Sequence, residues 1–213
     1  MLARVIQAFE KHWLLFHAMN VFVAGVWLFR GYLIYLDYRE RPSAGQILLM
    51  AMLGLLVVFY VFRRRSIDVA TDLRSVLLAH LGTWLPFALG TECPPAVPVE
   101  FLPVCTYLMT FSLAVSLMGF VSLGRSWGIL PANRGVQRHG LYRFIRHPIY
   151  ASYIAFDIPF LLTFACPLNA ALVVAIAVIH YSRARLEEKV LSRDPEYAEY
   201  MTKTRYMLLP WVI

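Results

Sequence analysis

Residues 46–65 read QILLMAMLGLLVVFYVFRRR, an uncharged run of seventeen residues followed by three arginines. An apolar run of this length comes close to the ~20 residues that a helix needs to cross the hydrocarbon core of a bilayer. Arginine clusters beside such runs typically stay on the cytoplasmic side of the membrane. The stretch therefore predicts a membrane helix whose C-terminal end faces the cytoplasm.

Five further apolar runs flank this one along the chain. The six runs cover, roughly, 13–36, 46–62, 75–90, 103–123, 149–165 and 168–182. With 60% hydrophobic and 15% charged residues, the chain of 213 residues has more apolar surface than one soluble core could bury. We expect an all-α, polytopic membrane helix bundle of five to six membrane segments, the first of them retained rather than cleaved as a signal peptide.

The charges of the loops predict the orientation of the bundle. Four arginines lie in 63–74, whereas 91–102 contains two glutamates and neither lysine nor arginine. The positive-inside rule therefore puts the first loop in the cytoplasm and the second outside. By alternation, segment 124–147, the tail 183–213 and both chain ends are cytoplasmic. Arg30 lies inside the first run, where it either snorkels to the surface or has a function.

The chain has a net charge of +7 and three cysteines, and the positions of these residues argue against several classes of protein. Most lysines and arginines flank apolar runs, so we expect no nucleic-acid partner. Cys93, Cys105 and Cys166 are widely spaced, without a CxxC motif or a histidine cluster. The sequence therefore supports neither a disulfide framework nor a zinc site, and we expect no metal.

The last two runs are separated by Cys166-Pro167-Leu168-Asn169, a turn signal, and Pro159 interrupts the first of them. Both are short for membrane crossings, so we expect a C-terminal helical hairpin, and whether it crosses fully stays open. The chain has no repeat or long linker. We expect one domain, 1–213, in which the N-terminal transmembrane helices, 1–123, precede a functional module, 124–213.

Two polar segments follow cytoplasmic helix ends. Positive-inside charge explains the arginines of 124–147 but not His147 or Tyr150 at the start of the fifth run. In the second segment, His180, Arg183 and Glu187 follow the i, i+3, i+7 spacing of one helix face. The alternative is a solvated helix stabilised by ion pairs such as the one between Arg185 and Glu188. Because the hairpin ties the two segments together, we expect a polar pocket at the cytoplasmic membrane surface.

Three motifs occur in order in this part of the chain. They are Gly140-Leu141-Tyr142-Arg143-x-x-Arg146-His147-Pro148-x-Tyr150, then Glu187-Glu188-x-x-Leu191, then Tyr197-x-x-Tyr200 with Arg205 and Pro210. Over about residues 122–212 the chain resembles the isoprenylcysteine carboxyl methyltransferase family. The resemblance implies that S-adenosylmethionine binds in a cytoplasm-facing pocket covered by the C-terminal segment, while a lipophilic substrate comes from the bilayer. The implied cofactor-binding residues are Gly140, Tyr142, Arg146, His147, Tyr150, Glu187 and Glu188.

We expect the methyl acceptor to be a carboxylate, which would be O-methylated without a general base. A carboxylate needs a cation to hold it, so Arg183 and Arg205 are the candidate substrate anchors. One glutamate could instead hold Arg183 in place. The chain departs from eukaryotic family members at 134–137, Arg-Gly-Val-Gln, and its short length is similar to that of bacterial or archaeal members. We therefore expect a prokaryotic inner (plasma) membrane protein whose substrate is a membrane lipid or a lipophilic small molecule.

Three other functions fit parts of the sequence. A related tail pattern occurs in membrane sterol reductases, which use NADPH, but the His147-Pro148 and Glu187-Glu188 pairs favour a methyltransferase. A phospholipid N-methyltransferase is a closely allied alternative. A non-enzymatic membrane scaffold or transport subunit would carry its charges near the bilayer midplane rather than at one surface.

Overall fold

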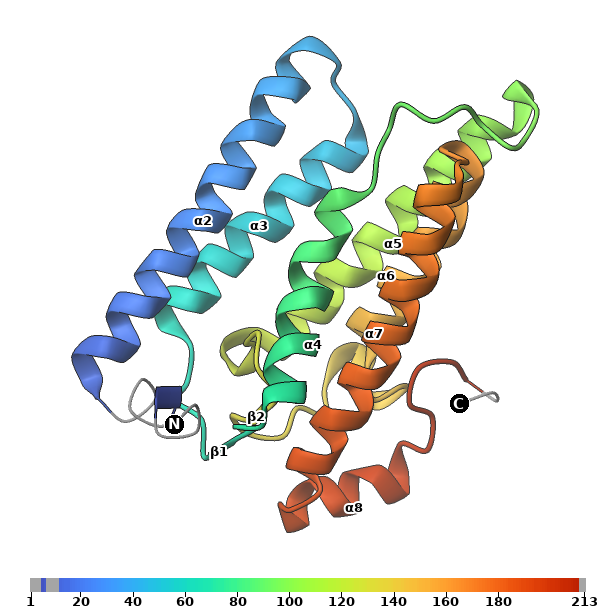
Figure 1. Ribbon diagram of the computed structural model, residues 1–213. Coiled ribbons are helices and arrows are strands. Elements are labelled where there is room, and N and C mark those ends of the chain that lie inside the picture. Colours follow the sequence, from blue (N-terminus) through green and yellow to red (C-terminus); the bar gives the residue numbers. More distant parts are fainter. Residues whose placement is uncertain (1–4, 7–11, 211–213) are drawn as a thin grey trace.

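The computed structural model describes residues 5–6 and 12–210 and is built almost entirely of helices (Figure 1). The ends of the chain, which we predicted to be cytoplasmic, lie outside the described residues. The long elements are α2 (Trp13–Glu40), α3 (Ala44–Phe62), α4 (Leu73–Trp84), α5 (Leu102–Leu123), α6 (Pro148–Thr163), α7 (Pro167–Leu191) and α8 (Pro195–Lys203). The short ones are β1 (Asp68–Val69), β2 (Ala132–Asn133) and the 3-10 turns η1 (Leu85–Ala88), η2 (Val99–Phe101), η3 (Gly124–Ser126) and η4 (Gly140–Arg143).

Each of the six apolar runs forms a helix, which confirms the all-α membrane bundle. Four helical segments are long and apolar enough to cross a membrane: α2, α3, α5 with its 3-10 extensions (Val99–Ser126), and α7. Helix α6 has 16 residues and α4 has 12. The 25 residues of α7 continue nine residues past its apolar run, so the second polar segment belongs to the same continuous helix.

Local sequence explains where these helices begin. The side chains of Ser43 and Asp72 accept hydrogen bonds from backbone N–H groups in the first turns of α3 and α4. Helices α5, α6 and α7 have a proline in their first turn, where its missing N–H removes no helical hydrogen bond.

The helices form a bundle with unlike ends (Figure 1). The hairpin of α2 and α3 lies on one side and the pair α6 and α7 on the other, with α4 and α5 between them. Strands β1 and β2 and helix α8 gather at one end, where the basic loops lie. Outward side chains of α2 such as Val21, Phe22 and Leu28 are more than half exposed. Apolar residues exposed all along a helix of this length need lipid around them, so the chain is an integral membrane protein.

The loops at the polar end are tied to one another. Strands β1 and β2 pair antiparallel, with Asp68 opposite Asn133. Asp68 also accepts a hydrogen bond from Arg193 at 2.6 Å, and the Asn133 amide donates to Asp194 at 2.7 Å. Two loops distant in the sequence are thereby joined to the turn between α7 and α8.

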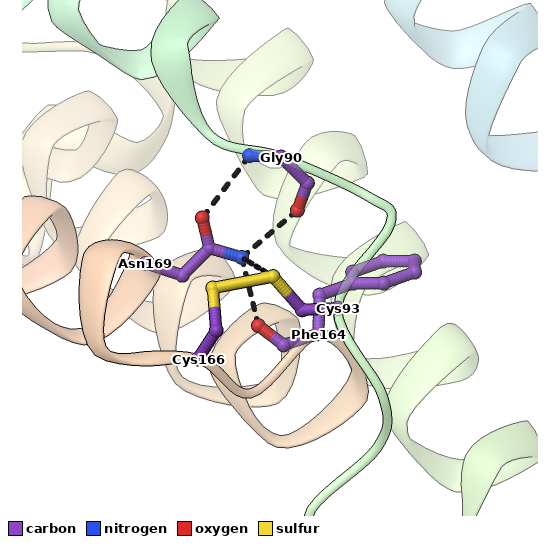
Figure 2. The surroundings of a disulfide bond; sticks show 5 residues. All are labelled: Gly90, Cys93, Phe164, Cys166 and Asn169. Carbon is purple, nitrogen blue, oxygen red and sulfur yellow. Dashed lines mark hydrogen bonds between the residues drawn. A yellow bond between two sulfur atoms is a disulfide. The ribbon is translucent and has the colours of Figure 1, made fainter.

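At the opposite end, a disulfide bond joins Cys93 to Cys166 (Figure 2). The sequence-based interpretation that no disulfide framework is supported was wrong on this point. Both cysteines lie on the side predicted to be outside the cytoplasm, while Cys105 is a buried free thiol in α5. Because disulfides persist in oxidising compartments, the bond supports the predicted outside placement of 91–102.

The side chain of Asn169 fastens the same loop to the hairpin (Figure 2). Its amide nitrogen donates to the carbonyl oxygens of Gly90 and Phe164, both at 2.8 Å, and its oxygen accepts from the Gly90 N–H at 3.0 Å. Asn169 is fully buried. A single amide therefore satisfies three backbone groups on two segments.

We expect Asn169→Ala to destabilise the protein, because each backbone group left unpaired costs about 1–3 kcal/mol. The melting temperature of the detergent-purified variant should fall by several degrees. The control is Thr106→Ala, since the Thr106 hydroxyl is exposed and bonds only to its own helix. Equal melting temperatures for the two variants would contradict the role given to Asn169.

Candidate functional site

A cavity of about 440 Å³ lies inside the bundle and joins its apolar middle to the polar end. Apolar residues of α2 and α3, among them Trp27, Leu53 and Leu56, form one part of its wall. The other part is formed by the segment before α6, by α6 and α7, and by two tyrosines of α8. The predicted pocket is therefore present, and it reaches further into the membrane part of the bundle than a surface pocket would.

The C-terminal segment lies against the start of α6. The backbone N–H groups of Arg146 and His147 donate to the carbonyl oxygens of Tyr206 and Met207, both at 2.9 Å. The Arg146 guanidinium donates to the carbonyl oxygens of Thr204 at 2.9 Å and Arg205 at 2.5 Å. Arg146 thus fixes the segment that follows α8.

His147 lies between two carboxylates of α7. Its Nδ1 is 3.7 Å from Glu187 Oε2, and its Nε2 is 3.4 Å from Glu188 Oε1. Glu188 also accepts a hydrogen bond from Arg146 Nε at 2.5 Å, and Glu187 accepts one from the Tyr150 hydroxyl. Glu187 lines the cavity, whereas Glu188 is buried behind it. The two glutamates therefore have different surroundings although they are adjacent in sequence.

A column of rings and one guanidinium continues from this group toward the membrane. The ring centroids of His147 and Tyr150 are 5.8 Å apart, and those of Tyr150 and His180 are 5.4 Å apart. The Arg183 guanidinium carbon lies 5.2 Å from the centroid of the Tyr150 ring, within the range of a cation–π contact. This column lies where the polar and apolar parts of the cavity wall meet.

Arg183 is held by neighbours from other parts of the fold. Its Nη2 donates to the carbonyl oxygen of Ile129 at 3.2 Å, and its Nη1 donates to the Thr83 hydroxyl at 3.5 Å. Its Nε has no hydrogen-bond partner among the described residues, although the side chain is only 5% exposed. A buried cation with an unused N–H beside a cavity is suited to bind an anion.

Three tyrosines complete the polar end. The Tyr200 hydroxyl donates to the carbonyl oxygen of Tyr142 at 2.5 Å, and the Tyr197 hydroxyl is buried without a hydrogen-bond partner among the described residues. Burial raises the pKa of Tyr142 and Tyr197 well above the ordinary value and that of Tyr200 to about 12. All three therefore remain protonated at neutral pH.

The structure brings most of the predicted site residues together. The cavity wall includes Tyr142, Arg146, His147, Tyr150, Arg183 and Glu187, with Glu188 directly behind. Gly140 and Arg205 are not among the residues that line it. Gly140 adopts a φ of 58° beside Ser122, where a side chain would clash, and it has a conformational role. The Arg205 side chain is exposed, because its backbone is turned to Arg146.

Two interpretations of the charged end of α7 were wrong. Glu188 is paired with Arg146 and not with Arg185, so this stretch is not simply a solvated helix with internal ion pairs. Among the described contacts, neither glutamate forms an ion pair with Arg183, so Arg183 is not held by an acidic residue.

Sequence reasoning did not identify the residues that hold Arg183. Thr83 lies in α4 and offers only a hydroxyl, and Ile129 acts through its carbonyl oxygen, so neither gives a signal in a single sequence. Gly82 lies beside them: a Cβ at this position would be 2.8 Å from both Cδ and Nη1 of Arg183. Gly82 therefore leaves the room that the guanidinium occupies.

We expect Gly82→Ala to destabilise the protein, although alanine is the better helix former by about 1 kcal/mol. The added methyl must displace Arg183 from its two acceptors, and such overpacking costs about 1–3 kcal/mol. Gly54→Ala is the control, since a Cβ at this helical glycine meets nothing within 4 Å. Thermal unfolding in detergent should give a lower melting temperature for Gly82→Ala and an unchanged or higher one for Gly54→Ala; a rise in both would refute the steric argument.

Comparison with known families gives one match. Residues 105–193 match the model of the isoprenylcysteine carboxyl methyltransferase (ICMT) family. The match runs from α5 through the end of α7 and includes His147, Tyr150, Arg183 and the two glutamates. No curated protein matches the chain.

Proposed function

We propose that this chain, whose residues 105–193 match the model of the isoprenylcysteine carboxyl methyltransferase family, transfers a methyl group from S-adenosylmethionine to the carboxylate of a lipophilic acceptor. The family indicates a methyltransferase. The assignment of cofactor and acceptor rests on the shape of one cavity. Its polar end contains His147 and Glu187, its other part is apolar, and Arg183 lies where the two parts meet.

The residues at the polar end suit S-adenosylmethionine, which supplies a methyl group bound to a positively charged sulfur. Glu187 offers a carboxylate to an ammonium or a ribose diol. The Tyr150 hydroxyl donates to this carboxylate and holds it in position. The unpartnered Tyr197 hydroxyl offers a hydrogen bond. On this proposal, Tyr142, His147, Tyr150, Glu187 and Tyr197 hold the cofactor, while Arg146 and Glu188 fix the segments around it.

Arg183 is the residue that we assign to the acceptor. A guanidinium fits a carboxylate with two parallel N–H donors, and the free Nε leaves such a pair available. The bonds from Arg183 to Thr83 and Ile129 fix its position before the acceptor binds. A carboxylate is ionised at neutral pH, so no residue has to remove a proton from it.

The other contribution of the protein is alignment and exclusion of water. Methyl transfer is an in-line displacement, and holding the two reacting groups in line is worth several kcal/mol. The segment fixed by Arg146 covers the start of α6, and burial of His147 and Arg183 separates the reacting groups from bulk water.

The same contacts weigh against the competing functions. A nicotinamide dinucleotide phosphate carries several phosphate charges. At the polar end of this cavity, the Arg146 guanidinium is already engaged by Glu188 and two carbonyl oxygens, and Glu187 adds a negative charge that would repel phosphate. An amine acceptor, as in a phospholipid N-methyltransferase, would be repelled by Arg183. A non-enzymatic scaffold would not need an internal cavity lined by buried ionisable side chains.

The orientation of the bundle supports a cytoplasmic cofactor site. The polar end carries the basic loops, and the disulfide lies at the other end. Intracellular S-adenosylmethionine would then reach Glu187 from the cytoplasm, and the acceptor would come from the bilayer. We further propose that the protein resides in a prokaryotic inner membrane.

We expect the detergent-purified protein to bind S-adenosylhomocysteine, and not NADPH, in a calorimetric titration. Glu187→Gln should weaken that binding by tenfold or more, since a hydrogen bond to a charged group is worth about 1.5–3 kcal/mol. Glu199→Gln is the matched control, because Glu199 is exposed and contacts Lys203 on its own helix. Binding of NADPH alone would favour the reductase, and binding of neither ligand would contradict the proposed function.

A further inference from the structure

Two of the ionisable side chains that line the cavity, Asp157 and Arg30, have no role in the proposed reaction. Asp157 of α6 is 5% exposed, and its Oδ2 has no hydrogen-bond partner among the described residues. Arg30 of α2 is partly buried, and its Nε likewise has no partner there. Both side chains line the cavity that Glu187 and Arg183 line. Arg30, which the sequence left unexplained, therefore faces the interior and not the lipid.

Both residues lie far from the proposed cofactor end. Asp157 is ten residues beyond His147 on the same helix, a separation of about 15 Å along the axis at 1.5 Å per residue. The Arg30 guanidinium lies 4.2 Å from the centroid of the Phe87 ring. Phe87 precedes Gly90 by three residues, and Asn169 ties Gly90 to the disulfide end of the bundle. Arg30 and Asp157 are therefore both in the half of the bundle that contains the disulfide.

The two side chains belong to opposite walls of the cavity. Helices α2 and α6 stand on different sides of the bundle (Figure 1). No ion pair joins Arg30 to Asp157 among the described contacts. Ionisable groups at membrane depth are costly and are usually retained for a ligand or a partner. Among the described residues neither side chain has an ion-pair partner, so the part of the cavity that they line needs a polar occupant.

We propose that Arg30 and Asp157 form a second polar subsite, which binds an uncharged hydrogen-bonding group, such as a hydroxyl, at the far end of the methyl acceptor. A hydroxyl can donate to the carboxyl of Asp157 and accept from the guanidinium of Arg30. The Arg30 guanidinium disfavours a cation, and the buried carboxyl oxygen of Asp157 needs a donor, which an anion does not offer, so the subsite favours a neutral group that both donates and accepts. This inference rests on the proposed function, because it concerns the acceptor of the same reaction.

The cavity wall between Arg183 and the Arg30–Asp157 subsite indicates the chemistry of the middle part of the acceptor. It is formed by apolar side chains, among them Met52, Leu53, Leu56, Phe156 and Ile176. The Arg183 guanidinium lies beside the Tyr150 ring, and Asp157 is seven residues further along α6, about 10 Å along the axis. The acceptor is therefore an amphiphile with a carboxylate at one end, held by Arg183, an apolar chain of at least about 10 Å, and a neutral polar group at the other end. A prenyl or fatty chain without a polar end group would leave Arg30 and Asp157 desolvated and without hydrogen-bond partners. Such a ligand should therefore bind much more weakly.

The test compares fatty acids with and without a terminal hydroxyl. The full chain in detergent, saturated with S-adenosylhomocysteine, is titrated with unbranched carboxylates from decanoate to octadecanoate and with the corresponding ω-hydroxy acids. We expect the ω-hydroxy acid to bind at least about tenfold more tightly than its parent at the chain length that spans the cavity. Arg30→Met and Asp157→Leu should each abolish this preference while leaving the affinity for S-adenosylhomocysteine unchanged.

Ile158→Leu serves as the control, because Ile158 neighbours Asp157 but is 60% exposed on the outer face of α6. It should keep the preference. Asp157→Asn retains the size and the hydrogen-bonding capacity of the side chain, so it should keep part of the preference for the ω-hydroxy acid. It therefore distinguishes loss of the subsite from loss of folding. Equal affinities for both series at every length, or a preference that survives in both Arg30→Met and Asp157→Leu, would overturn the subsite.

Two further outcomes are distinguishable from these. A third series, the α,ω-dicarboxylates of the same chain lengths, tests the charge of the bound group. A stronger preference for these dicarboxylates than for the ω-hydroxy acids, lost only in Arg30→Met, would overturn the assignment of a neutral group. Failure to bind S-adenosylhomocysteine at all would remove the proposed function itself, and the subsite as part of it. Binding of S-adenosylhomocysteine without any ω-hydroxy preference would leave the proposed function intact and reject only the subsite.

Discussion

The imidazole of His147 lies between the carboxylates of Glu187 and Glu188, and this contact joins the start of α6 to the end of α7. Arg146 extends the group by binding Glu188 and the carbonyl oxygens of the C-terminal segment. Because these charges are buried together, removing one partner would leave the others desolvated and unpaired. The covering segment, the orientation of Tyr150 and the polar end of the cavity all depend on this group.

The fold could be predicted because membrane helices are determined by the length of their apolar runs and oriented by loop charge. The site was partly predictable for a related reason: the spacing of His180, Arg183 and Glu187 places them on one face of a continuous helix. Contacts between distant elements were not predictable. The disulfide, the Arg146–Glu188 pair and the outward direction of Arg205 depend on which loops meet in space, and the Ile129 carbonyl that holds Arg183 has no sequence signature.

The cavity connects two environments that the proposed methyl transfer needs together. S-adenosylmethionine is water-soluble and charged, whereas the proposed acceptor is lipophilic, so a site at the end of the bundle must be polar on one side and apolar on the other. Arg183 lies at that boundary and is the residue by which a carboxylate at the end of an apolar chain could be recognised. Gly82 leaves room for it, and Tyr150 stacks beneath it.

The most direct test is to measure methyl transfer by the variant Arg183→Lys. The protein is given labelled S-adenosylmethionine and a lipophilic carboxylate, and the base-labile methyl ester that forms is quantified. Arg185→Lys is the control, because the Arg185 side chain is exposed. We expect Arg183→Lys to retain S-adenosylhomocysteine binding but to lose at least about tenfold in kcat/KM for the acceptor, because lysine cannot form the bidentate pair. Arg185→Lys should behave as the parent. Unchanged transfer by Arg183→Lys would contradict the assignment of this residue to the acceptor carboxylate.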